Sequence, residues 1–193
     1  MPRAKEFDPD TVLNRAMELF WLKGYEATSI KNLVDHMGIN RFSLYSTFGD
    51  KHQLFLSACD RYHETMAEDG LRQLEESEDG LESIRRYLWQ LVDRYAAEDG
   101  SRGCFMTNNT CELTPHDEKA AEKTGAYLLR VQAAFYRAVG RAHQHGEVQQ
   151  QHRLNDYARF LTSTVQGLAV LAKVKPNRDV YEAVVNVTLD SLK

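Results

Sequence analysis

A short run near the front of the chain, RFSLYST from Arg41 to Thr47, concentrates side chains that can donate hydrogen bonds. Hydroxyl groups and other short donors suit phosphate oxygens, whereas a long arginine can reach the edge of a guanine. Lys51 follows, at the predicted start of another helix, where its ammonium and free backbone N–H groups can hold one phosphate together. These residue types and their spacing predict a surface that binds nucleic acid.

Helix start and stop signals surround this run. Asp8 and Pro9 begin a first helix that ends at Gly24, and Thr28 or Ser29 caps a second helix that ends at Gly38. Asn40 caps a short third helix over residues 40–48, and a fourth runs from Lys51 towards Met66. Two helices joined by a short turn with a glycine fit the helix-turn-helix motif that reads a DNA major groove. A tight helical corner of a bundle fits the same spacing.

Charge and composition bound the function. The 193 residues carry a formal net charge of −4, and acidic residues outnumber basic ones in the first 60 as well, so nucleic-acid binding depends on a few well-placed cations. Hydrophobic residues make up 42% of the chain and no apolar run reaches the length of a membrane span, so we expect a cytoplasmic protein with no membrane partner. Three cysteines without paired metal spacing predict reduced thiols.

The remaining sequence predicts helices only. An acidic, glycine-punctuated stretch over 66–79 suggests a boundary, and helical patterns follow over 81–97, 104–113, from Thr114 or Pro115 to about 143, 157–173 and 180–192. The expected fold is all-α. Residues 1–50 would form a helix-turn-helix domain of three helices, and 51–193 a larger helical domain with 51–66 as connector.

The segment ATSIKNLVDHMGINRFSLYSTFGDKHQLF, residues 27–55, resembles the DNA-binding segment of TetR/AcrR-family transcriptional regulators. The preceding AMELFWLKGYEATS resembles the first helix of that family. The resemblance implies that Thr28, Tyr45 and Lys51 contact phosphates and that the recognition helix contains Arg41, Phe42, Ser43, Ser46 and Thr47. Many relatives have small or basic residues where Phe42 and Ser46 stand, so sequence preference does not transfer.

The segment YARFLTSTVQGLAVLAKVK resembles the family's penultimate helix, which packs with the last helix against a second copy of the chain. The resemblance implies a homodimer on a pseudo-palindromic double-stranded DNA operator. The expected interface residues are Phe160, Leu161, Val165, Leu168 and Leu171. An internal core made by the same side chains is the alternative.

The family commonly holds a small effector between helices of its C-terminal domain, and ligand binding lowers the affinity for the operator. Aromatic residues with a few polar groups around RGCFMTNNTCEL suggest such a pocket for an unidentified molecule, although helical aromatics also form ordinary cores. The expected pocket residues are Trp89, Tyr95, Cys104, Phe105, Thr107, Asn108, Cys111 and Tyr127.

Other chemistries find less support in the sequence. Cys104, close to a predicted helix start and beside Arg102, is a hypothetical sensor of oxidants or electrophiles, and buried inert thiols are the alternative. His143, His145, Glu147 and His152 lie in a polar connection without fixed ligand spacing, so we expect neither metal nor cofactor.

No phosphate loop or nucleophile elbow indicates an enzyme. The sequence therefore predicts a DNA-binding regulator, most simply a repressor released by a small molecule or thiol modification; a helical protein-binding adaptor is the alternative.

Overall fold

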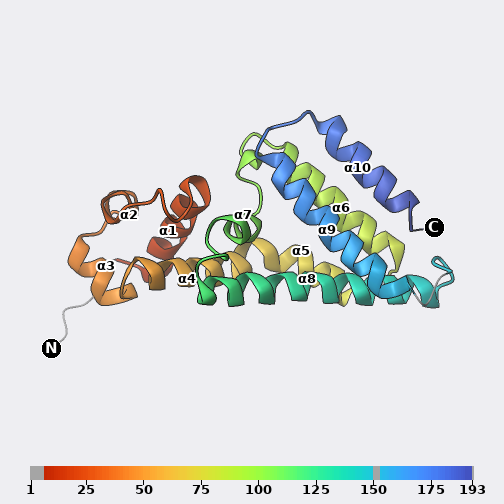
Figure 1. Cartoon of the computed structure of the whole chain (residues 1–193), viewed down its shortest axis with the longest axis horizontal. Helices are drawn as coiled ribbons and strands as arrows, with labels where there is room; N and C mark the ends of the chain where they lie inside the picture. The colour runs from red at the N-terminus through yellow and green to blue at the C-terminus, as the bar shows by residue number, and fades with distance from the viewer. Residues whose placement is uncertain (1–6, 150–152, 193) are drawn as a thin grey trace. The chain divides into compact units, whose positions relative to one another are not determined.

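The computed structural model describes residues 7–149 and 153–192, and Figure 1 follows their helices along the chain. The regular secondary structure of these residues is entirely helical, which confirms the all-α prediction. The helices are α1 Pro9–Lys23, α2 Ile30–Met37, α3 Arg41–Phe48, α4 Lys51–Tyr62, α5 Glu68–Glu76, α6 Leu81–Ala96, α7 Phe105–Glu112, α8 Glu118–Gln144, α9 Leu154–Ala172 and α10 Arg178–Asp190, with a π-helical turn η1 at His63–Ala67 and a 3₁₀ turn η2 at Gly100–Arg102.

The chain folds into two compact units. Unit 1 comprises Met1–Met66 and Asn108–Thr124, and unit 2 comprises Ala67–Thr107 and Gly125–Lys193. The expected boundary at residue 50 thus falls inside unit 1, because α4 packs along α1 and buries Leu54 and Phe55 completely. A second difference is that residues 108–124, far along the chain, also belong to unit 1.

Aromatic side chains form much of the core of unit 1. Phe20 of α1 meets Phe55 of α4 edge to face, with 5.4 Å between ring centroids, and Trp21 meets Tyr62 in the same way at 5.0 Å. Such pairs stabilise a fold beyond the area that they bury. The α1–α4 pair is therefore the base on which the shorter helices α2 and α3 rest.

The division between the two units falls at the start of the acidic stretch 66–79, between Met66 and Ala67, and most of that stretch is the helix α5. Its Leu71 and Leu74, three residues apart on α5, are buried in unit 2. On the outer side Arg130 of α8 donates hydrogen bonds to Glu68 Oε2 at 2.7 Å and to Glu75 Oε2 at 2.9 Å. The Arg130 hydrogen bonds lower the pKa of Glu75. Two acidic residues of α5, Glu68 and Glu75, therefore pair with α8.

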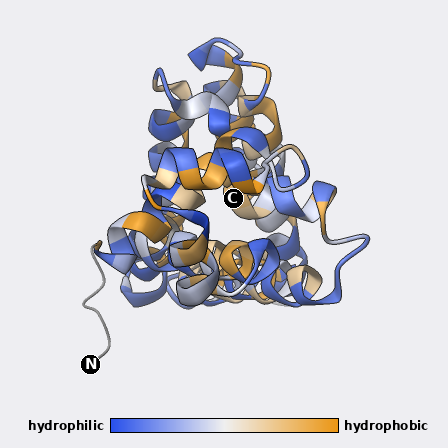
Figure 2. Ribbon diagram, turned by 90° about the vertical axis from the view of Figure 1, so that its left-hand side faces the viewer, coloured by the Kyte–Doolittle hydropathy of each residue, from blue (hydrophilic) through white to orange (hydrophobic). Residues whose placement is uncertain are grey.

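The helices α6, α9 and α10 of unit 2 lie side by side (Figure 1). Figure 2 shows hydrophilic and hydrophobic residues interleaved along the ribbons, as in helices with one buried face. Among the described residues, none of the helices combines the length and the apolar character that crossing a membrane requires.

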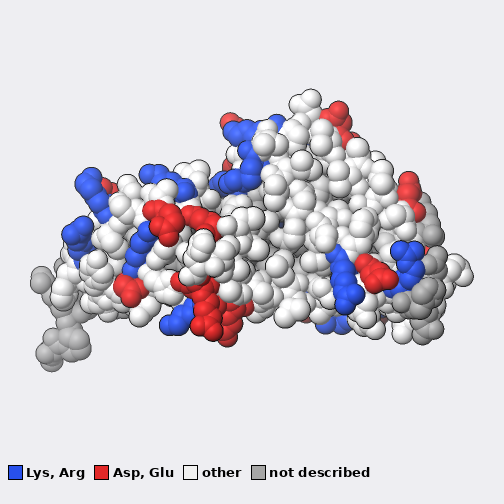
Figure 3. Space-filling model, viewed as in Figure 1, with Lys and Arg blue, Asp and Glu red and all other residues white. Residues whose placement is uncertain are grey.

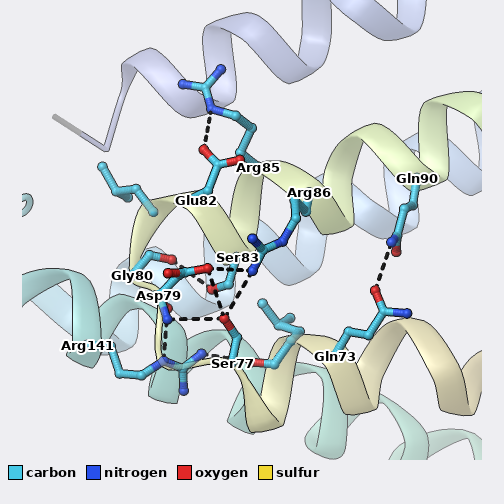
Figure 4. A network of polar contacts seen from close by, with 12 residues as sticks. Gln73, Ser77, Asp79, Gly80, Glu82, Ser83, Arg85, Arg86, Gln90 and Arg141 are labelled. Atoms are coloured by element: carbon cyan, nitrogen blue, oxygen red, sulfur yellow. Dashed lines mark hydrogen bonds and ion pairs between the residues drawn. The ribbon is translucent and has the colours of Figure 1, made fainter.

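A polar network closes the turn between α5 and α6 in unit 2 (Figure 4). Arg86 Nη2 donates to Asp79 Oδ2 at 2.6 Å and to Ser77 Oγ at 3.1 Å, and Arg141 Nη2 of α8 donates to the Leu74 carbonyl at 2.8 Å. A Cβ atom on Gly80 would lie 2.4 Å from Ala142 Cα, so only glycine permits this approach. The network fixes where α6 begins.

The starts of α2 and α8 can be compared with the positions expected from the sequence. Ser29, not Thr28, caps α2, because its Oγ accepts the Asn32 backbone N–H at 3.1 Å. The helix expected from Thr114 or Pro115 begins at Glu118 instead. Its cap is Asp117, whose Oδ1 accepts the Ala120 N–H at 2.8 Å.

Candidate nucleic-acid interface

The short helix α3 is held by its cap and by one core residue. Asn40 Oδ1 accepts the Ser43 N–H at 2.8 Å, and Leu44 is fully buried between the helices of unit 1. The turn before it requires the left-handed conformation of Gly38, at φ 71°, whose N–H donates to the Val34 carbonyl at 3.0 Å. These local contacts set α2 and α3 as a helix-turn-helix.

The outer face of α3 is free of other parts of unit 1. Arg41, Phe42, Tyr45 and Ser46 are exposed, and Ser43 and Thr47 are partly exposed. Residues 41 and 45, and likewise 42 and 46, are four apart and therefore neighbours on one helix face. The expected recognition residues thus lie together, within reach of a single groove.

Lys51 stands on an aromatic platform beside this face. Its Nζ lies 4.1 Å from the ring centroid of Tyr25, and that ring meets Phe55 at 4.9 Å and Phe20 at 6.1 Å between centroids. A cation over a ring face is stabilised by the ring quadrupole. Partial burial lowers the pKa of the Lys51 ammonium. Tyr25 therefore positions Lys51, a role that sequence reasoning missed although the Gly-Tyr pair was visible.

Thr28 does not lie where a phosphate contact was expected. Its side chain has 0% exposure, and its hydroxyl donates to the Gly24 carbonyl at 2.6 Å. The hydroxyl is thus used inside the turn between α1 and α2. Thr28 shapes the turn in this structure, and the exposed hydroxyl beside it belongs to the capping residue Ser29.

The same turn carries a contact that no local pattern predicts. The carboxylate of Glu112, at the end of α7, accepts the Glu26 backbone N–H at 2.9 Å, across 86 residues of sequence. Gly24, at φ 85°, leaves the space that this carboxylate occupies, since a Cβ there would lie 2.6 Å from Glu112 Oε2. Glu112 therefore stabilises the turn that leads into α2.

Two side-chain contacts join the 108–124 segment to α4 within unit 1. Lys123 Nζ lies 2.5 Å from Asp60 Oδ1, and His52 Nε2 lies 2.7 Å from Asp117 Oδ2, although the imidazole is not oriented for a hydrogen bond. The hydrogen bond from the Ala120 backbone N–H lowers the pKa of the Asp117 carboxyl, and the nearby His52 lowers it to a smaller extent. On the face shown in Figure 3, charges of both signs are interspersed over α1 to α4, in agreement with the mixed charge of the first 60 residues.

The residues expected to form an effector pocket are distributed over both units. Trp89, Tyr95, Cys104, Phe105, Thr107 and Tyr127 belong to unit 2, whereas Asn108 and Cys111 belong to unit 1, and Cys111 is exposed. The reason is that α7 begins in unit 2 and ends in unit 1. The expected set is therefore divided between the two units.

Within unit 2, buried phenols surround Cys104. Its Sγ lies 4.0 Å from the Tyr127 hydroxyl, and burial, followed by the nearby Cys104, raises the pKa of Tyr87 and of Tyr95. The Tyr181 hydroxyl and Gln166 Nε2 are buried and have no hydrogen-bond partner among the described residues. The sequence did not indicate Tyr87 or Tyr181, since tyrosine at helical spacing is typical of an ordinary core, and no pattern marked Gln166.

An apolar groove runs between α9 and α10. Its volume is about 470 Å³, and it is lined by Phe160, Thr164, Gly167, Leu168, Leu171, Ala183, Val184, Val187 and Thr188. Three of the five expected interface residues line it. The other two, Leu161 and Val165, are buried inside the chain and do not line it. The surface over α9 and α10 in Figure 3 is largely free of charged side chains.

Among the described residues, no three His, Cys, Asp or Glu side chains are placed to hold a metal ion. The His143 Nδ1 atom instead lies 2.7 Å from the Val148 carbonyl oxygen. His152 lies outside the described residues.

Two family models match the chain. Residues 12–58 match the bacterial regulatory proteins of the tetR family, and residues 80–188 match the tetracyclin repressor-like C-terminal domain. The uncharacterized HTH-type transcriptional regulator YezE of Bacillus subtilis is 35% identical over 193 residues, which cover 100% of both chains. The HTH-type transcriptional repressor ComR of Escherichia coli is 31% identical over 89% of this chain and 82% of its own length.

Among solved structures, a cysteine mutant of the TetR family transcriptional regulator CifR, complexed with a 26-base-pair operator DNA, has a TM-score of 0.89. It is 28% identical and covers 99% of this chain and 100% of its own. The chain therefore belongs to the TetR family. It is a DNA-binding transcriptional regulator and not an enzyme, which confirms the family and the class expected from the sequence.

Proposed function

We propose that the chain is a homodimeric repressor that binds a pseudo-palindromic DNA operator through α3 and is released by a small molecule or by modification of a thiol. The observation that carries this proposal is the exposed face of the capped helix α3, on which Arg41, Tyr45 and Ser46 stand beside Lys51. ComR is named a repressor, and CifR is bound to operator DNA, which supports the same role here.

The side chains of this face divide by length. Tyr45 and Lys51, with Ser43 and Thr47, offer donors to phosphate oxygens, which fix register without reading sequence. Arg41, in the first turn of α3, is long enough for a bidentate contact with a guanine. Thr28 acts indirectly, because its hydroxyl holds the turn before α2.

A second copy of the chain is the natural cover of the α9–α10 groove. Phe160 and Val187 are exposed although large and apolar, and the groove between their helices has the size of a cavity that takes side chains. A two-fold dimer presents two copies of α3 to two half-sites, which gives the specificity that one short helix lacks.

Unit 2 supplies the groups for an effector. The unpartnered Gln166 Nε2 and Tyr181 hydroxyl would donate hydrogen bonds to an acceptor on a bound molecule. Cys104 is buried against Tyr127, so a covalent effector that reaches it must be small. Both routes place the event in unit 2.

Selection of bound sites from random double-stranded DNA tests the proposal. We expect enriched sites with two-fold symmetry and half-sites about one helical turn or more apart. Arg41→Ala should relax the preference at one base pair of each half-site. Enrichment without symmetry would exclude the dimeric mode, and no enrichment at all would exclude DNA reading by α3.

A second measurement tests the thiol route. Operator binding of the wild type and of Cys104→Ser is compared before and after a small electrophile or mild peroxide, with Cys111→Ser as control for an exposed thiol. Loss of the response in Cys104→Ser alone supports modification of Cys104. The same response in all three proteins assigns release to another group.

A further inference from the structure

Phe42 is the most exposed large apolar side chain among the described residues of α1 to α4, at 80% exposure. It occupies the second position of α3, directly after Arg41 and one turn before Ser46. Its neighbours on this face are polar, and Ser46 donates its own hydroxyl to the Ser43 carbonyl at 3.2 Å. A phenyl ring therefore stands among hydrogen-bonding groups on the face proposed to enter the groove.

The backbone under Phe42 is fixed before any ligand arrives. The Asn40 cap closes on the Ser43 N–H at 2.8 Å, and Leu44 anchors the opposite side of the helix at 0% exposure. Phe42 belongs to this first, capped turn, so its direction follows from the helix and not from a mobile loop. A helix that docks its first turn against base edges brings the ring to the groove floor.

We infer that Phe42 recognises the C5 methyl group of a thymine in each operator half-site. This inference rests on the proposed binding of DNA by α3. A phenyl ring offers no hydrogen bond to a base edge, and every polar edge that it covered would be desolvated without a partner. The thymine methyl is the one apolar group that base pairs present in the major groove, and phenylalanine is among the side chains suited to it.

The expected size of the effect follows from the transfer of one methyl group. Burial of a methyl or methylene group changes an equilibrium constant about fourfold. Two symmetric half-sites would make this about 15-fold for the whole operator. Removal of the ring itself has a larger effect on affinity, because it also exposes the ring's contact area on the DNA.

Deoxyuridine is the probe, because it differs from thymidine only by the missing methyl. The selected operator is resynthesised with deoxyuridine at one symmetric pair of thymines at a time. Equilibrium binding of the wild type, Phe42→Ala and Phe42→Leu is then measured at one salt concentration. We expect one pair of positions at which deoxyuridine lowers the operator affinity of the wild type about 15-fold and leaves the affinity of Phe42→Ala unchanged.

Phe42→Leu keeps an apolar surface and should retain part of the loss at that pair, while the other thymines should affect all three proteins equally. Because Phe42 is exposed, its replacement should leave the thermal unfolding midpoint unchanged, which a melt checks. Equal losses in wild type and Phe42→Ala at every thymine would overturn the inference, as would operators without a required thymine.

The control variant Arg41→Ala separates this failure from failure of the proposed function. If Arg41→Ala alters base preference and Phe42→Ala leaves affinity and thymine dependence unchanged, α3 reads DNA without Phe42. If neither variant changes binding, the proposed role of α3 itself fails.

Discussion

Among the described residues, the fold leaves both the α3 face of unit 1 and the α9–α10 groove of unit 2 open, and these two surfaces differ in chemistry. The α3 face of unit 1 is polar, with hydroxyls, Arg41 and Lys51 around a single phenyl ring. The α9–α10 groove of unit 2 is apolar, and among its lining residues only threonine hydroxyls are polar side-chain groups. Hydroxyl groups and a few cations suit contacts with the phosphate backbone of DNA, whereas an apolar groove suits another protein surface. The comparison predicts opposite responses to salt, because phosphate binding releases counterions and apolar burial does not.

We expect the largest effect from a charge placed in the α9–α10 groove. Val187 is 70% exposed in the single chain and lines the groove, so Val187→Glu should fold normally and yet bury a carboxylate in any dimer. An unpaired buried charge costs several kcal/mol, so we expect dimerisation weaker by more than about 100-fold. Sedimentation equilibrium measures this, and operator affinity should fall with it.

The control is Leu129→Glu, an equally exposed apolar residue of α8 that does not line the groove. A dimer unaffected by Val187→Glu would place the interface elsewhere. Leu168 is a poorer site for this test, since it is 1% exposed and a charge there would disturb the core of the chain itself.

We expect the second-largest effect from removing the Lys51 ammonium beside the α3 face. Lys51→Ala should reduce the salt slope of operator binding by about 0.9 for each half-site, hence by about 1.8 for the dimer. This corresponds to roughly 30-fold weaker binding at about 0.15 M salt, the same for all DNA sequences. Binding titrations over several salt concentrations provide the slope.

Lys119→Ala is the matched control, because it removes the same charge from an exposed position of α8 in unit 1. An unchanged slope in Lys51→Ala would mean that the ammonium on Tyr25 does not touch a phosphate. In neither variant should dimerisation respond.

The smallest effect sharpens the comparison by testing what holds the polar side in place. Glu112→Ala removes the acceptor of the Glu26 N–H, and we expect a loss of about 1 kcal/mol of stability, since the contact is partly solvated. The unfolding midpoint should fall by about 2–4 °C. Glu122→Ala, an exposed carboxylate of α8 in the same unit, is the control. Equal midpoints in the two variants would show that the Glu112 contact adds no stability.

The parts of this fold that depend on neighbouring residues were predictable. The caps Asp8 and Asn40, the glycine turns and the bounds of α3 all follow from signals within a few residues of each helix end. Helix α5 escaped prediction because its acidic composition resembles a linker until Arg130, 62 residues after Glu68, is placed beside it.

The candidate sites were predictable only in part. Spacing identified the exposed residues of α3, but it could not show that Thr28 turns inward, because Thr28 and Ser29 are equally good caps in sequence. The resemblance to the family's penultimate helix suggested five apolar interface residues on α9 and left an internal core as the alternative. It could not say that Leu161 and Val165 are buried away from the groove while the exposed Phe160 lines it, since that depends on where α6 and α10 pack.

The composition of unit 1 has a consequence for the construction of chimeric regulators. A fragment cut after Met66 would contain α1 to α4 but would lack residues 108–124, and with them Glu112, Asp117 and Lys123. The order of the chain therefore does not permit a simple exchange of front and rear halves. A hybrid that keeps the operator preference of this protein needs the donor's segment 108–124 together with its first 66 residues, transplanted as two pieces.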